Sequence, residues 1–273
     1  MRKLIIILIS LSCSLQAFSQ LFEISIKELE KAEFTVTYSL DFQRDSLDPK
    51  HIGHEKMLLF IGKDISEFLS YYSYFNDIEM RKMETSSQLQ EWLNTIPPMP
   101  NIPYYIYKNY PVGKITYIEH AAFTPFKYEE NLELFTWQLS TDTATIGGYH
   151  AQKATTSFGG RDWVAWFAPE LPYNDGPYKF NGLPGLIVKV YDTRNHYVFE
   201  MTSIEKAQEG TMITMREMQY VETTKLGFFK AEDAFRDDIV NRVKEKGVTN
   251  SEEQQLAARN MAHKNNPIEL IRK

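Results

Sequence analysis

Turn signals recur through the middle of the chain, from residue 103 to residue 205, and they constrain the fold more than any other feature of the sequence. They stand at residues 109–113, 147–148, 159–160, 174–177 and 192–195. Glycine, proline, asparagine and aspartate at such points let the backbone reverse direction. Reversals at this spacing favour antiparallel strands over parallel strands joined by crossover helices. We therefore predict an antiparallel meander over residues 103–205.

The N-terminal part is predicted to add two strands. Residues 34–42 alternate apolar with polar side chains at a period of two, which places one apolar face on a sheet. That face consists of Phe34, Val36, Tyr38, Leu40 and Phe42. A second strand is expected over residues 56–61, after a polar turn around residues 48–50.

Helices are expected in two places. Aromatic and aliphatic residues between 68 and 78 have helical spacing, although such a run can also begin as a strand, and we predict a helix over residues 76–94. The prolines between residues 97 and 103 then form an ordered linker. In the tail, an apolar stripe predicts a helix over residues 230–246, and a capping box at 251–254 begins another that reaches about Lys264.

These elements predict a mainly β (α+β) fold. We expect a single antiparallel sheet that forms an open or half-closed barrel, with helices packed on it and a helical tail at residues 230–273. Residues 20–273 are enough for one domain to bury a large core. We therefore expect one domain there.

The first 19 residues have the layout of a cleavable signal peptide. Arg2 and Lys3 precede an apolar run at residues 4–11, and Ala17 and Ser19 provide small residues for cleavage. The run is too short to span a bilayer, and no later run is long enough for a transmembrane segment. We predict cleavage near Ser19 and an exported protein, periplasmic or secreted.

A lipoprotein signal with a lipid on Cys13 is the alternative. A lipobox has a large aliphatic residue three positions before the cysteine, but Ser10 stands there. Cys13 is the only cysteine. The mature chain would therefore have no disulfide, no thiolate nucleophile and no cysteine-ligated metal.

The charge of the chain argues against nucleic acid as a partner. Removal of residues 1–19 leaves 28 Lys and Arg against 36 Asp and Glu, so the net charge changes from -6 to -8. Phosphate backbones are bound by clustered Lys and Arg.

Three segments, at residues 148–154, 160–167 and 176–187, closely resemble the GLPGLI family of exported bacterial proteins. The hexapeptide that names the family stands intact at residues 182–187. The resemblance implies a protein exported by a Gram-negative bacterium, without an established activity and often encoded near genes for outer-membrane receptors.

The hexapeptide also has a physical interpretation of its own. Proline followed by glycine fits a type II turn over residues 183–186, so the block can be a fold signature that holds strands in register. Alternatively it is a docking surface for a partner. The binding residues would then be Arg161, Trp166, Lys179, Leu183 and Pro184, of which Arg161, Trp166 and Lys179 would be exposed.

Motifs of catalysis and metal binding are missing. The sequence has no nucleophile elbow, phosphate-binding loop or dinucleotide fingerprint, and we predict no catalytic residue, cofactor or metal. His51, His54 and Glu55 have the right types for zinc, but they lie in a polar turn without evident further ligands. Four acids remain as material for a carboxylate pair, namely Asp162, Glu170, Asp175 and Asp192.

The sequence thus favours a non-enzymatic protein of the cell envelope. Its partner would be another envelope protein, such as an outer-membrane receptor, or an apolar ligand inside the barrel. A secreted hydrolase that uses a carboxylate pair is the alternative.

Overall fold

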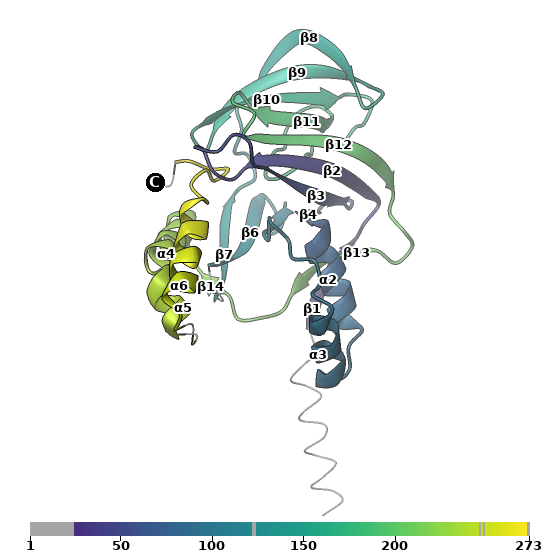
Figure 1. Ribbon diagram of the computed structural model, residues 1–273. Helices are drawn as coiled ribbons and strands as arrows, with labels where there is room; N and C mark the ends of the chain where they lie inside the picture. Colours follow the sequence, from purple (N-terminus) through teal and green to yellow (C-terminus); the bar gives the residue numbers. More distant parts are fainter. Residues whose placement is uncertain (1–24, 122–123, 246, 248, 272–273) are drawn as a thin grey trace, which may run out of the picture.

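The computed structural model describes residues 25–121, 124–245, 247 and 249–271, so the expected signal peptide lies outside the described residues (Figure 1). Within these ranges, a 12-stranded sheet has the order β14-β7-β6-β5-β4-β3-β2-β12-β11-β10-β9-β8. Its strands are β2 (Phe34–Gln43), β3 (Ile52–Ile61), β4 (Ser66–Ser70), β5 (Tyr105–Lys108), β6 (Lys114–Ala121), β7 (Thr124–Asn131), β8 (Gln138–Ile146), β9 (Tyr149–Phe158), β10 (Arg161–Ala168), β11 (Leu186–Asp192), β12 (Tyr197–Lys206) and β14 (Val221–Glu222).

The sheet curls but stays open, because its end strands β14 and β8 do not pair with each other (Figure 1). Neighbouring strands are antiparallel, except that β14 runs parallel to β7. The predicted fold, mainly β with an open antiparallel sheet and added helices, is confirmed.

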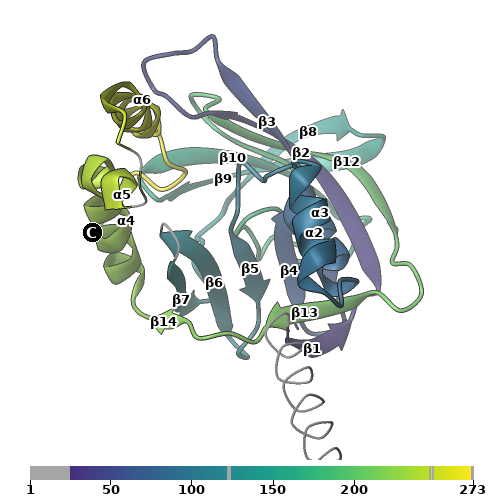
Figure 2. The same cartoon turned by 60° about the horizontal axis from the view of Figure 1, so that its bottom comes forward.

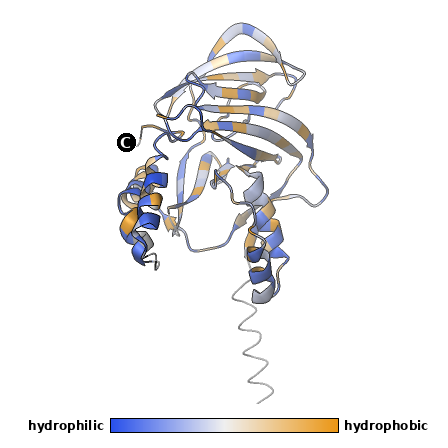
Figure 3. Ribbon diagram, in the orientation of Figure 1, coloured by the Kyte–Doolittle hydropathy of each residue, from blue (hydrophilic) through white to orange (hydrophobic). Residues whose placement is uncertain are grey.

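Strand β2 joins the two halves of the sheet. Its period-two pattern directs Val36, Tyr38, Leu40 and Phe42 into the core, where each is 3% exposed or less. On one side β2 pairs with β3 along its whole length, and on the other side with β12. Polar and apolar bands alternate along these strands in Figure 3.

Aromatic rings fill the inner face of the sheet. The fully buried ones are Tyr38, Phe68, Trp163, Phe167, Tyr178, Phe180, Phe199 and Phe228. Each such ring removes about 150–250 Å² of surface from water, which at roughly 25 cal/mol per Å² is several kcal/mol. The interior in which we expected an apolar ligand is therefore occupied by the protein's own side chains.

A second, two-stranded sheet covers the outer face of β3 to β6. It consists of β1 (Ile26–Lys31) and β13 (Met212–Arg216). Ile213 and Met215 pack there against Leu58 and Phe60. Because β3 is covered on both faces, residues 57–61 form a continuous apolar run instead of an alternating one.

The helix predicted over residues 76–94 is two helices. The first, α2 (Tyr71–Arg81), begins five residues earlier than predicted, after the N-cap Ser70. The second, α3 (Ser86–Asn94), begins at a capping box that Thr85 forms with Gln88. The single long helix was wrong because these caps satisfy the free amide groups of a new helix start.

The helical tail is confirmed, with shifted bounds. It contains α4 (Lys225–Asp237), α5 (Ile239–Glu245) and α6 (Ser251–Ala262), which lie together beside β6 and β7 (Figure 2). Phe228 and Phe229 attach α4 to the core. The N-cap of α6 is Asn250, one residue before the predicted one. No helix among the described residues is long and apolar enough to cross a membrane.

Candidate functional site

The hexapeptide at residues 182–187 forms a tighter turn than predicted. The Gly185 amide donates to the Leu183 carbonyl at 2.8 Å, which closes a three-residue turn in place of the four-residue type II turn. Gly185 has a φ of 148°, and a Cβ there would overlap the Ala168 carbonyl oxygen. Glycine is therefore required because two stretches of backbone touch.

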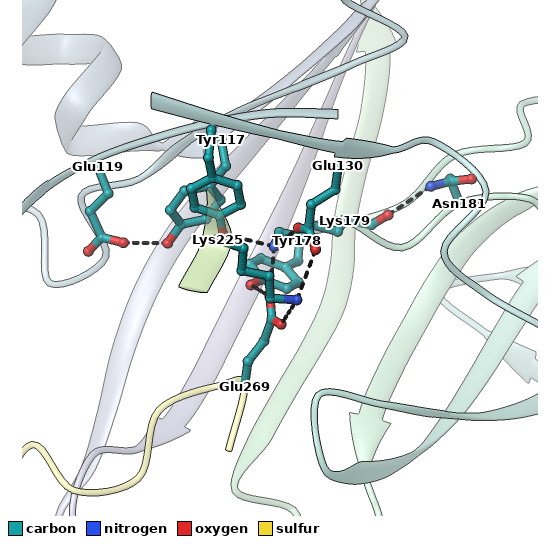
Figure 4. A network of polar contacts seen from close by, with 9 residues as sticks. Tyr117, Glu119, Glu130, Tyr178, Lys179, Asn181, Lys225 and Glu269 are labelled. Atoms are coloured by element: carbon teal, nitrogen blue, oxygen red, sulfur yellow. Dashed lines mark hydrogen bonds and ion pairs between the residues drawn. The ribbon is translucent and has the colours of Figure 1, made fainter. Parts of the chain in front are cut away.

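Lys179, in the loop before this turn, is fully buried among acids and rings (Figure 4). Its Nζ donates to a Glu269 carboxylate oxygen at 2.7 Å and to the Tyr128 hydroxyl at 3.1 Å, and it also contacts Glu130. The rings of Tyr117, Tyr128 and Tyr178 lie between 4.9 and 5.4 Å from the same nitrogen. These contacts replace the water that the ammonium group loses.

Lys225 of α4 completes a cluster of two ammonium and two carboxylate groups, in which Lys179 and Glu269 are buried and Lys225 and Glu130 are half-buried. Its Nζ lies 2.9 Å from Glu130 and also contacts Glu269 (Figure 4). Burial would raise the pKa of Glu269, but Lys179 and Lys225 together hold it below its ordinary value. The cluster, Lys179, Lys225, Glu130 and Glu269, is neutral when all four groups are charged.

Arg161 is only 5% exposed, and it binds residues close to Glu269 near the C-terminus. Its guanidinium donates to Asp192 at 3.0 Å, to the Asn266 side chain at 2.7 Å, and to the carbonyls of Pro267 and Ile268 at 2.7 and 3.0 Å. The planar fork of five N–H groups suits such a set of acceptors.

Arg161 and Lys179 therefore hold one piece of chain, residues 266–271, which we call the strap. The Gly159 carbonyl also accepts hydrogen bonds from the strap, from the amides of Leu270 and Ile271 at 2.6 and 3.1 Å. The prediction that Arg161 and Lys179 are exposed was wrong, because the strap occupies the donors of both side chains.

The other three predicted binding residues differ in exposure. Leu183 is buried in the core, whereas Pro184 is exposed. Trp166 is half-buried and lines a hollow of about 410 Å³ with Lys189 and Tyr191. The predicted set is thus not one surface.

The strap and the end of α6 form one wall of a cavity of about 580 Å³, which we call the tail cavity. Strands β2, β6 and β12, the linker at residues 99–103 and α4 contribute the other walls. Apolar lining residues are Phe42, Met99, Ile102, Tyr197, Phe235 and Met261. Ionisable lining residues are Arg44, Glu119, His120, Glu232, Arg236 and Lys264. This volume and this mixture of walls are those of small-molecule sites.

Tyr117 connects the cluster of Lys179, Lys225, Glu130 and Glu269 to the tail cavity. Its hydroxyl donates to Glu119, which lines the cavity, while its ring lies 4.9 Å from Lys179 Nζ (Figure 4). Burial raises the pKa of Tyr117 well above its ordinary value, so the hydroxyl keeps its proton.

A larger hollow, about 710 Å³, lies on β2, β3 and β12 beside α2. Several of its charged groups already have partners: Asp41 bonds His54 at 2.6 Å, and Lys56 lies 4.4 Å from the Tyr71 ring centre.

The histidines and acids considered as ligands or catalysts are dispersed. His51 bonds Asp48 and His54 bonds Asp41, so the two rings face different partners. Each of the four acids has a separate partner: Asp162 binds Ser157, Glu170 binds the His150 amide, Asp175 binds Lys108, and Asp192 binds Arg161. No group of three metal-ligating side chains occurs in the part of the chain described above.

Sequence reasoning missed Glu130, Lys225 and Glu269. One signal was available, because Lys179 stands between Tyr178 and Phe180, and a cation within an aromatic run can be buried against acids. Nothing local to residue 269 indicates which cation it meets.

Comparisons with known proteins agree with this description of the fold. A family model described as "Protein of unknown function (Porph_ging)" matches residues 159–189, which include Gly159, Arg161 and Lys179, three of the residues that hold the strap. No curated protein matches the sequence. PNGF-II in its P21 crystal form is similar with a TM-score of 0.50 and 17% identity, over 75% of this chain and 34% of that chain. PNGF-II in its C2 crystal form has a TM-score of 0.50 and 16% identity, over 75% of this chain and 33% of that chain. The chain thus spans about a third of the PNGF-II chains, and the likeness is one of fold.

Proposed function

We propose that this chain is an exported, non-enzymatic binding protein of the cell envelope that holds a small ligand in the tail cavity. One observation carries the proposal: a cavity of about 580 Å³ in which aromatic and aliphatic walls face several charged side chains. Ligand sites have this size and composition. The signal-like first 19 residues support export.

The binding of a partner protein through Arg161 and Lys179 has lost its basis, because both side chains are buried beneath the strap. An envelope receptor would instead have to contact exposed groups such as Trp166 or Pro184. We therefore favour a small ligand over a receptor as the binding partner.

The alternative, a secreted hydrolase with a carboxylate pair, now depends on different acids. Glu119 and Glu232 line the tail cavity together, unlike the four acids considered from the sequence. Turnover of a glycan, ester or peptide substrate that is lost in both Glu119→Gln and Glu232→Gln would favour the hydrolase.

Fluorescence of N-phenyl-1-naphthylamine, a neutral apolar dye, tests the binding site. We expect the mature protein to bind the dye, and Ile102→Trp and Met261→Trp, which fill the cavity from the linker and from α6, to weaken binding at least fivefold. Leu139→Trp, on the exposed edge strand β8, is the matched control. An unbound dye, or equal binding by the filled variants with unchanged melting temperature, would refute the proposal.

A further inference from the structure

The tail cavity has an uneven distribution of charge. Three cations, Arg44, Arg236 and Lys264, line it against two carboxylates, Glu119 and Glu232. Burial and the nearby charge of Arg216 lower the pKa of His120, so His120 adds no charge at neutral pH. The side chains that line the cavity therefore carry one more positive than negative charge, in a chain whose net charge is -6, and Asp233, outside the lining, pairs with Arg236.

The cations in this cavity are incompletely satisfied. The ammonium group of Lys264 has no hydrogen bond or ion pair with any described residue. The Nε of Arg236 is buried without an acceptor among the same residues, although its Nη1 lies 3.4 Å from Asp233. Lys264 is exposed, so an oxygen acceptor that enters the cavity can reach its ammonium group and give it the partner that it lacks.

The three cations act on one region of space. Burial lowers the pKa of Lys264, and the charges of Arg44 and Arg236 lower it further, whereas Glu119 and Glu232 act in the opposite direction. Such mutual effects require the charges to be near one another. Arg44 is fixed by a 3.0 Å hydrogen bond to Asn101 and lies 5.6 Å from the Phe42 ring centre.

Apolar side chains line the same cavity as these cations. Phe42 and Tyr197 are stacked, with ring centres 6.4 Å apart, and Phe235 and Met261 line the cavity from α4 and α6. A ligand that satisfies both the cations and the apolar side chains has an anionic head and an apolar body.

We propose that the ligand of the tail cavity is an amphipathic anion, a carboxylate on an apolar chain, with its head at Arg44, Arg236 and Lys264 and its chain along Phe42, Tyr197 and Met261. This inference rests on the proposed function, because it specifies the occupant of the same cavity. The carboxylate can belong to a free acid or to a larger lipid.

Decanoate and decyltrimethylammonium, which share a chain length and carry opposite heads, test the inference by displacement of N-phenyl-1-naphthylamine. We expect decanoate to bind at least tenfold more tightly. Lys264→Gln should weaken decanoate binding about fivefold, as expected for the loss of roughly 1 kcal/mol from an exposed charge. Its melting temperature should not change, because the ammonium group has no protein partner. Lys230→Gln, an exposed lysine of α4 outside the cavity, is the matched control.

Failure of this inference is distinguishable from failure of the proposed function. If the dye binds and both heads displace it equally, or if Lys264→Gln binds decanoate as the wild type does, the cavity is a site but its anion preference is refuted. If the dye does not bind at all, the proposed function fails first. Binding to phosphatidylglycerol vesicles without binding of decanoate would also overturn the inference, since a surface contact with lipid heads would explain it.

Discussion

Replacement of Lys179 by methionine should destabilise the fold strongly. The substitution keeps a similar volume but leaves Glu269, which is 2% exposed, and Glu130 with Lys225 as their common cation. Removing one partner of a buried ion pair costs about 3–5 kcal/mol, because a charge stays behind without compensation. For a chain of this size, that lowers Tm by roughly 6–20 °C.

Urea unfolding of Lys179→Met measures the loss, and its pH dependence checks the cause. In the wild type, the pKa of Glu269 is lowered on folding, so its contribution to stability is present above the ordinary carboxyl pKa and is lost as pH falls through the folded value. The difference between variant and wild type should therefore shrink on acidification. Lys189→Met is the matched control, since its pair with Glu200 is partly exposed and contributes about 1 kcal/mol or less. Equal unfolding free energies for Lys179→Met and Lys189→Met would refute the reasoning.

Four further predictions address other parts of the molecule. Arg161→Ala should release the strap and accelerate trypsin cleavage after Lys264. The control Arg194→Ala, at an exposed turn, should leave the cleavage rate unchanged. Unchanged cleavage in both variants would show that Arg161 does not hold the strap. Gly182→Ala should lower the free energy of unfolding only by the strain of a positive φ, roughly 1–3 kcal/mol, because a Cβ there meets no other atom. Gly185→Ala should lower it more, because its Cβ overlaps the Ala168 backbone. The reverse order in urea unfolding would contradict this packing argument. Burial raises the pKa of Glu67 to about 8, so between about pH 4.5 and 8 the folded state keeps a proton that the unfolded state loses, and wild-type stability should fall as pH rises through this range. Glu67→Gln should remove this pH dependence of stability. An unchanged pH dependence in the variant would exclude Glu67 as its source. Mass measurement of the exported protein should give Gln20 as the N-terminal residue, and a start at a lipid-modified Cys13 would contradict the predicted cleavage.

Local patterns predicted the strands well, because a sheet with one buried face repeats at a period of two. Residues 34–42 show that period and form β2. The helix boundary between α2 and α3 was missed, although Thr85 and Gln88 formed a readable capping box. The pair β1 and β13 could not be predicted, since these short strands have no clear apolar face until they are placed against Leu58 and Phe60.

Most of the candidate site could not be predicted from the sequence, because the residues that form it are far apart along the chain. The loop around Lys179 could be located, but its burial depends on Glu130 and Glu269, which lie on other elements. A lysine or arginine in a turn-rich segment is exposed by default, and only the position of the strap reverses that expectation. The tail cavity likewise forms from elements separated by most of the chain.

The strap also determines when the fold can be completed. Asn266 donates to the Gln43 carbonyl, a contact across 223 residues, and Lys179 meets Glu269 across 90 residues. A nascent chain cannot form either contact until residues 266–269 have emerged, so Arg161 and Lys179 lack their acceptors in the strap while the next 105 and 90 residues are synthesised. Proteins dominated by contacts between residues far apart in the sequence fold slowly, and their folding intermediates expose apolar surface that promotes aggregation. We therefore expect this chain to fold late, after translation of the tail, and to depend on holding chaperones while it waits.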